Sequence, residues 1–161
     1  MTTTAFEPHD HRRCIQSALT GAEARVRDNG VRLTPVRRRT LEILLERHGA
    51  MGAYEVLDRL AAEGFGHQPP VAYRALEFLV ENGLVHRIRR LNGFAACTHP
   101  GGDHHAAFLI CRACNALAEI ADAPMQRALE QGAAHAGFTV ERASIEALGL
   151  CAGCRDDEGA E

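Results

Sequence analysis

The chain of 161 residues contains no lysine, and all eighteen of its basic residues are arginine. It has no uninterrupted apolar run of about 18 residues, the length that a membrane-spanning helix requires. Its first eleven residues lack the basic and then apolar pattern of a secretion signal. We therefore predict a cytoplasmic protein with no membrane partner. Its six cysteines are then reduced, which favours metal binding over disulfides.

The usual sequence signatures of catalysis are also missing. There is no His-Glu-x-x-His pair, no nucleophile and base at a recognisable spacing, and no glycine-rich phosphate loop. We predict that the protein is not an enzyme, has no catalytic residue and takes no small-molecule substrate.

The net charge of −3 is unevenly distributed along the chain. Residues 12–90 carry fourteen Arg against nine acidic residues, whereas residues 91–161 carry four Arg against ten acidic residues. A basic front half and an acidic back half indicate one module that faces DNA and a separate module for sensing or assembly. Arginine suits phosphate and guanine contacts, although a GC-rich genome would produce the same excess of arginine over lysine.

Two Cys-x-x-Cys pairs, Cys111/Cys114 and Cys151/Cys154, are the most specific motif of the chain, and 36 residues separate them. Each pair directs two thiolates toward one ion, and two pairs complete the four-sulfur tetrahedron that Zn²⁺ prefers. The long separation predicts that the ion joins two segments that are distant in sequence.

Hydrophobic periodicity predicts an α+β fold with two parts. In the front half we expect helices over residues 14–29, 35–48, 53–63 and 71–81, then strands over 84–90 and 94–98. Asn92-Gly93 is a hairpin signal between these strands. Helices followed by a β-hairpin in a basic segment are typical of a winged helix-turn-helix, whose last helix enters the major groove. In the back half we expect strands over 106–110, 116–120 and 138–148, and a helix over 122–136.

Several of these motifs together resemble the ferric uptake regulator (Fur) superfamily. They are Arg32-Leu33-Thr34-Pro35, Gln68-Pro69-Pro70-Val71-Ala72-Tyr73-Arg74-Ala75-Leu76 and the two Cys pairs. Ala53-Tyr54-Glu55-Val56-Leu57 and Gly149-Leu150-Cys151-Ala152-Gly153-Cys154 are most similar to its zinc uptake regulator (Zur) branch. The resemblance implies a zinc-responsive repressor that binds palindromic operators of zinc-acquisition genes as a zinc-loaded homodimer. A Fur-type sensor of iron, manganese, nickel or peroxide is the alternative, and a zinc-binding adaptor for protein contacts is a more distant one.

Composition and the resemblance together predict five segments in the chain. They are a disordered tail (1–13), a winged-helix DNA-binding domain (14–98), a hinge (99–105), a small α/β dimerisation domain stapled by zinc (106–154) and an acidic tail (155–161).

Two zinc ions per monomer follow from the same resemblance. Cys111, Cys114, Cys151 and Cys154 match the structural zinc ligands, and His86, Cys97, His104 and Glu119 match the regulatory zinc ligands. A thiolate in the second set favours zinc over iron or manganese. His105 competes with His104 for one position, and His99 and Asp103 are possible substitutes or part of a third, weaker site. The alternatives are that Cys97 is a small buried side chain and that His86 and Glu119 face solvent.

The resemblance assigns the reading of operator DNA to four residues. Tyr73 and Arg74 are expected to contact bases, since Arg bridges guanine O6 and N7 and a Tyr ring packs on thymine methyls. Arg32 and Arg37, with their neighbours Arg38 and Arg39, are expected to contact phosphates. We expect no metal-binding role for His9, His11, Cys14 or His135.

Overall fold

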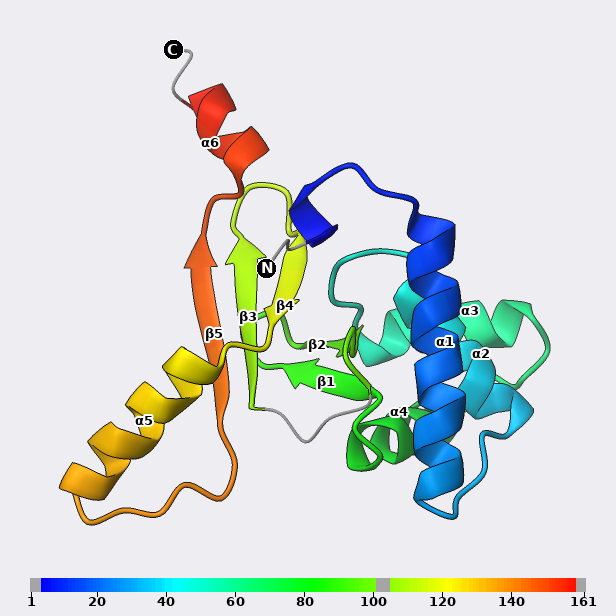
Figure 1. The fold of residues 1–161 in the computed structure, drawn as a ribbon. Coiled ribbons are helices and arrows are strands. Elements are labelled where there is room, and N and C mark those ends of the chain that lie inside the picture. The colour runs from blue at the N-terminus through cyan, green and yellow to red at the C-terminus, as the bar shows by residue number, and fades with distance from the viewer. Residues whose placement is uncertain (1–3, 101–104, 159–161) are drawn as a thin grey trace. The chain divides into compact units, whose positions relative to one another are not determined.

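The computed structural model describes residues 4–100 and 105–158. It divides the chain into two compact units (Figure 1). We call Pro8–Gly102 the helical unit, and the unit made of Met1–Glu7 and Asp103–Glu161 the sheet unit. The helical unit has four α-helices and a two-stranded hairpin, and the sheet unit has a three-stranded sheet. This confirms the predicted α+β class.

The boundaries of the helices in the helical unit follow local sequence signals. Its helices are α1 (His11–Asp28), α2 (Pro35–Leu45), α3 (Ala53–Ala62) and α4 (Pro69–Glu81). α2 and α4 both begin with proline, whose fixed φ suits the first helical turn and whose missing N–H is not needed there. α1 begins after Asp10, whose carboxylate accepts hydrogen bonds from the backbone N–H groups of Arg12 and Arg13.

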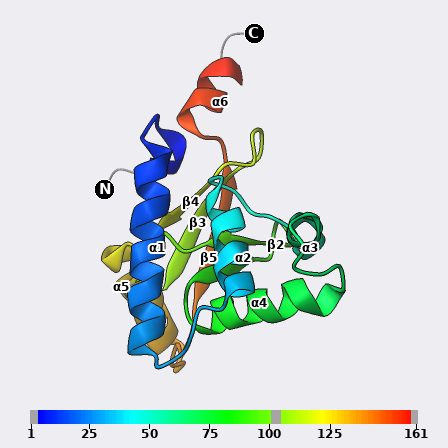
Figure 2. The same ribbon diagram turned by 90° about the vertical axis from the view of Figure 1, so that its right-hand side faces the viewer.

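The helices of this unit pack around one apolar core. α2, α3 and α4 contact one another, and α1 contacts α2 (Figure 2). Each helix contributes a stripe of apolar residues at helical spacing, and burial of one such side chain stabilises the fold by about 1.5–3 kcal/mol. The largest fully buried side chains of the core in α2, α3 and α4 are Leu41, Ile43, Leu44, Val56, Leu60, Leu76 and Leu79. This core fixes the orientation of α4.

A β-hairpin completes the helical unit, and we call it the wing. Its strands β1 (Val85–Ile88) and β2 (Gly93–Ala96) pair antiparallel. Asn92 adopts a positive φ of 45° in the turn, whereas Gly93, the second residue of the predicted Asn-Gly turn, is already the first residue of β2. Gly93 is required by space, because a Cβ there would lie 3.0 Å from the backbone oxygen of Met51. Met51 and Phe94 exchange two backbone hydrogen bonds, so the loop before α3 anchors the wing.

The sheet unit is built on a central strand with two different neighbours. The order is β4 (Leu117–Ile120), β3 (Ala106–Cys111), β5 (Ser144–Gly149), with β3–β4 antiparallel and β3–β5 parallel. The crossover from β4 to β5 contains α5 (Ala123–His135), and α6 (Ala152–Glu158) follows β5. A short 3-10 helix, η1 (Thr4–Phe6), contacts β4.

The observed elements differ from the predicted ones at four places. α1 begins at His11 and η1 covers Thr4–Phe6, so parts of the predicted disordered tail have regular structure. β5 begins at Ser144 rather than at residue 138, because the N–H of Phe138 bonds to Ala133 and still belongs to the end of α5. α6 extends into the predicted acidic tail. Residues 101–104 of the predicted hinge lie outside the described residues.

Within the part of the chain that the structure describes, no helix combines the length and apolar character needed to cross a membrane.

Candidate metal centres and nucleic-acid interface

The two Cys-x-x-Cys pairs meet at one edge of the sheet. β3 ends at Cys111, whose partner in the parallel register is Gly149, the last residue of β5. The segments that follow these strands therefore leave the sheet at the same edge, and Cys111 and Cys114 meet Cys151 and Cys154. All four Sγ atoms lie within 4.8 Å of one another. The expectation that the pairs join two distant segments agrees with this arrangement.

Hydrogen bonds around these sulfurs favour a thiolate at one position. The backbone N–H groups of Cys114, Cys151 and Ala113 lower the pKa of the Cys111 thiol to about 6. The N–H of Cys151, for example, donates to the Sγ of Cys111 at 3.4 Å. Conversely, hydrogen bonds to the sulfurs of Cys151, Cys114 and Cys111 raise the pKa of Cys154 to about 12. When the four thiols lie this close, a negative charge on one sulfur makes deprotonation of the next one less favourable. A bound cation removes this repulsion, so binding of a cation in place of the protons is favoured.

The spacing of the sulfurs fits Zn²⁺. The Sγ atoms of Cys114 and Cys151 are 3.9 Å apart. The edge of a tetrahedron with Zn–S bonds of about 2.3 Å is roughly 3.8 Å. An all-thiolate donor set is also one of those that structural zinc sites use.

His86 and Cys97 lie on the same face of the wing. His86 is paired with Ala95 across the hairpin, and Cys97 follows two residues later, so the two side chains are diagonal neighbours. The N–H of Cys97 donates to Leu84 at 2.9 Å and continues the ladder. A ring nitrogen of His86 and the Sγ of Cys97 lie within 4.8 Å. Cys97 is buried, and its sulfur accepts a hydrogen bond from the backbone N–H of His99 at 3.4 Å.

The other predicted regulatory ligands belong to different parts of the chain. Glu119 is in β4 of the sheet unit, opposite Phe108, and is only 7% exposed. It therefore does not face solvent, and a carboxyl group is rarely this buried without a partner. His104 lies outside the described residues, and its competitor His105 is half-buried next to β3. Within the helical unit the structure thus brings together His86 and Cys97.

The predicted base-reading residues are exposed on α4. Tyr73 and Arg74 are on the solvent side of the helix, whereas Ala72 and Leu76 face the core. The ring of Tyr73 meets that of Tyr54 edge to face, with the ring centres 6.4 Å apart. Tyr54 is 63% exposed and extends this aromatic surface onto α3. The sequence motif contained Tyr54, but only the packing of α3 against α4 indicates its place beside Tyr73.

α3, α4 and the wing line a groove of about 520 Å³ beside these tyrosines. Arg87 and Asn92 of the wing line it, and Glu55 of α3 and Glu77 and Glu81 of α4 contribute negative charge. A polyanion therefore meets attraction from the wing and from Arg74 but repulsion from the three glutamates.

The two arginines expected at phosphates differ in their surroundings. Arg32 is exposed just before α2. Arg37 is held inside the unit, because its Nη1 donates to the carbonyl of Arg32 at 2.9 Å and its guanidinium covers the ring of Phe78.

Their neighbours Arg38 and Arg39 are engaged by carboxylates. Arg38 forms ion pairs with Glu23 and Glu42. Arg39 forms a bidentate pair with Glu63, at 2.6 and 2.8 Å, and also contacts Glu42 and Glu46. Their charge is therefore largely compensated within the helical unit, unlike that of Arg32.

One cluster of metal-binding side chains was not predicted. His9, His11, Cys14 and His48 have donor atoms that all lie within 4.8 Å of one another in the helical unit. The run His-x-His-x-x-Cys over residues 9–14 is a recognisable signal for three of these ligands. His48, the fourth residue of the cluster, is too far along the sequence to be linked to the others by a spacing motif.

Comparison with known proteins identifies the class to which this two-unit arrangement belongs. Residues 28–148 match the ferric uptake regulator family, and the chain belongs to this family. The zinc uptake regulation protein of Escherichia coli (strain K12) is 36% identical over 144 residues, covering 89% of this chain and 84% of that protein.

Solved structures give the same result. A zinc uptake regulator complexed with zinc and DNA is 36% identical and has a TM-score of 0.82, covering 91% of this chain and 98% of that one. The crystal structure of holo XcZur, also 36% identical, has a TM-score of 0.78 and covers 86% of this chain and 96% of that one.

Proposed function

We propose that this protein is a zinc-responsive transcriptional repressor, which binds palindromic operators of zinc-acquisition genes as a zinc-loaded homodimer in the cytoplasm. The observation that carries the proposal is the pairing of His86 and Cys97 on one face of the wing. These two side chains supply imidazole and thiolate to an ion directly on the element that flanks the recognition helix. The relatives described above, which include a zinc uptake regulator solved with zinc and DNA, support the same function.

We assign a structural zinc to Cys111, Cys114, Cys151 and Cys154. The support is the convergence of their four sulfurs and the N–H groups that stabilise negative charge on Cys111. A structural zinc contributes about 10–16 kcal/mol of apparent binding free energy that is also folding free energy. Its role is to hold the ends of β3 and β5 together.

We assign the regulatory zinc to His86, Cys97, His104 and Glu119. Two imidazoles, one thiolate and one carboxylate form a set that suits tetrahedral zinc. Iron(II) and manganese(II) prefer harder ligands, so the thiolate of Cys97 favours zinc over them. The burial of Glu119 supports its inclusion.

DNA contact is assigned to the exposed surface of α4 and its surroundings. Tyr73 and Arg74 read base edges, and Arg32 contacts the backbone. Arg37 supports this surface through its position between Arg32 and Phe78.

A second copy of the chain is assigned to the sheet unit. In the described structure α5 has no buried residue, and β5 is exposed along most of its length. Phe138 and Leu148, two large apolar side chains of this unit, are 66% and 50% exposed. A twofold-related partner would cover this apolar surface and place two winged helices on the two halves of a palindrome.

The test is DNA binding as a function of free zinc. A duplex selected from a random library by the zinc-loaded protein serves as the probe, and fluorescence anisotropy measures affinity. We expect zinc to raise affinity about 5- to 150-fold, which corresponds to a coupling of roughly 1–3 kcal/mol. His86→Ala and Cys97→Ser should remain folded dimers by circular dichroism and sedimentation but lose this response. His135→Ala, on α5, is the matched control and should keep it.

Two results would refute the proposal. One is equally tight binding by protein that has been stripped of exchangeable metal, and the other is an unaltered zinc response in Cys97→Ser. Titration with iron(II), manganese(II) and nickel(II) separates a zinc sensor from its relatives that sense other metals. A binding affinity that does not depend on salt would instead indicate a protein-binding adaptor.

A further inference from the structure

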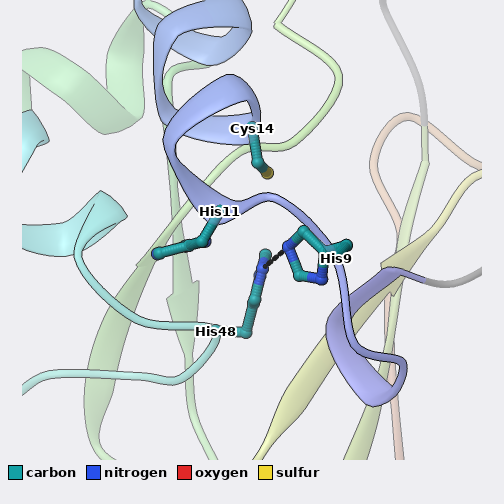
Figure 3. Close-up of side chains that lie close together, drawn as sticks. All are labelled: His9, His11, Cys14 and His48. Atoms are coloured by element: carbon teal, nitrogen blue, oxygen red, sulfur yellow. Dashed lines mark hydrogen bonds between the residues drawn. The ribbon is translucent and has the colours of Figure 1, made fainter.

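Three imidazoles and one thiol meet where α1 begins (Figure 3). His9 precedes α1, His11 and Cys14 lie in its first turn, and His48 is in the loop that follows α2. The ring centre of His48 lies 4.8 Å from the ring centre of His9 and 4.8 Å from that of His11. The spacing of three residues between His11 and Cys14 places both side chains on one face of the helix.

The orientation of His11 is fixed by a backbone carbonyl. Its Nε2 lies 3.0 Å from the carbonyl oxygen of Glu46. Because a carbonyl only accepts, Nε2 carries the proton, and the lone pair of the neutral ring is on Nδ1. This Nδ1 is buried and has no hydrogen-bond partner. Histidine ligands of metals have this arrangement, since one ring nitrogen donates to a carbonyl and the other is left for the ion.

His9 and His48 face each other through their Nε2 atoms, which are 2.9 Å apart. One of these nitrogens donates a proton to the other, so a single shared proton holds two nitrogen lone pairs together. A metal ion in this position would bind both nitrogens.

We propose that His9, His11, Cys14 and His48 form a further zinc site inside the DNA-binding unit, separate from the two sites assigned above. Three imidazole nitrogens and one sulfur suit Zn²⁺ and not Mg²⁺ or Ca²⁺, which require oxygen ligands. Asp10 lies within the same run of sequence, but its carboxylate caps α1. When zinc binds, the S–H proton of Cys14 passes to solvent as the Zn–S bond forms.

An ion at this site connects three parts of the helical unit. It joins the segment before α1 and the first turn of α1 to the loop between α2 and α3. The same loop contains Met51, which pairs with Phe94 of the wing. The site therefore stabilises the start of α1 and the loop that anchors the wing, and it does so without any ligand from the sheet unit.

The experiment compares zinc content in tag-free, full-length protein. His86→Ala/Cys97→Ser serves as the parent, because it removes the regulatory pair and leaves the four-cysteine site and the proposed site. Zinc per monomer is measured by mass spectrometry after dialysis. We expect His9→Gln/His48→Gln to lower the zinc content of this parent by one equivalent. The control variant, His135→Gln, should leave it unchanged.

Cobalt(II) provides a readout that folding defects do not imitate. Mild chelation first removes exchangeable zinc from the parent and leaves the tightly held zinc of the four-cysteine site in place. Cobalt(II) added to this protein should give a sulfur-to-cobalt absorption band that its Cys14→Ser variant lacks, while both proteins show the same far-ultraviolet circular dichroism. Added zinc should raise the melting temperature of the parent but not that of Cys14→Ser. Equal zinc content with and without His9→Gln/His48→Gln, or an unchanged cobalt band in Cys14→Ser, would overturn the proposal.

Discussion

The guanidinium carbon of Arg37 lies 3.6 Å from the centre of the Phe78 ring, so an arginine of α2 covers an aromatic ring of α4. The same guanidinium donates to the carbonyl of Arg32. Arg37 thus ties the segment before α2 to the helix that we assign to DNA reading, and its contribution is structural as well as electrostatic.

Arg37→Ala is therefore expected to lower the free energy of unfolding by about 1–2 kcal/mol, through loss of the cation–π contact and of one hydrogen bond. Urea denaturation of the zinc-loaded protein measures this. Arg32→Ala is the control, since the side chain of Arg32 is exposed and its carbonyl is retained. An Arg37→Ala variant as stable as the parent would mean that the stacking contributes nothing.

Arg74→Ala should weaken binding to the selected duplex without altering stability. Loss of a bidentate guanine contact costs about 1–3 kcal/mol and relaxes the preference at one base position. Arg32→Ala should instead weaken binding to all duplexes and reduce the slope of log affinity against log salt by about 1. Anisotropy titrations at several salt concentrations distinguish these effects. A uniform loss across sequences for Arg74→Ala would place that residue at a phosphate.

The pair Arg39–Glu63 predicts a specific dependence on pH. Hydrogen bonds from Arg39 lower the pKa of Glu63 below its ordinary value of 4.5. Because the folded pKa is the lower one, the stabilisation is complete above pH 4.5 and is lost as the pH falls below that value. Urea midpoints from pH 6 to pH 3 should fall less steeply for Glu63→Gln than for the parent. Glu77→Gln, on the exposed side of α4, should fall as the parent does.

Removal of the structural zinc should unfold the sheet unit alone. Cys151→Ser leaves three sulfurs, and strong chelation removes the ion altogether. Both tyrosines of the chain, Tyr54 and Tyr73, are in the helical unit. We therefore expect a partial loss of far-ultraviolet circular dichroism, because α1–α4 stay folded, while the near-ultraviolet tyrosine signal persists. Loss of both signals in parallel would show that the two units unfold together.

Leu148→Glu should dissociate the dimer that we propose. Leu148 is half-exposed on β5, and a charge there would be buried by a twofold partner at a large cost. Sedimentation velocity should detect monomers of Leu148→Glu and dimers of the control variant Leu148→Met. A dimeric Leu148→Glu variant would exclude this face as the interface.

Much of the fold follows from local signals in the sequence. α2 and α4 each begin with proline, and Asn92 lies in the turn of the wing. These residues set the local backbone conformation by themselves, so these elements are predictable. The start of β5 could not be predicted in this way. Residues 138–143 include apolar side chains that suit a strand, but they form the connection between α5 and β5, and Phe138 is still hydrogen-bonded to Ala133 of α5.

The candidate sites are predictable to different extents for the same reason. The four cysteines are recognised from their own spacing. His48 lies beside His9 and His11 only because α1 packs against α2 and brings the loop after α2 to the start of α1. The charge pattern also overstates the DNA-facing surface, because Arg38 and Arg39 are paired with glutamates that are distant in sequence or on another helical turn.

The parallel pairing of β3 with β5 affects how the chain is completed during synthesis. The helical unit has all its strands and helices once residue 97 has left the ribosome, but β3 has no parallel neighbour until residues 144–149 are translated. A nascent chain, or one that ends between residues 114 and 144, would contain the complete helical unit. Its Cys111 and Cys114 would lack the two cysteines that complete their metal site. In such a chain the helical unit would be folded, but β3 would have an unpaired edge, and unpaired strand edges promote aggregation.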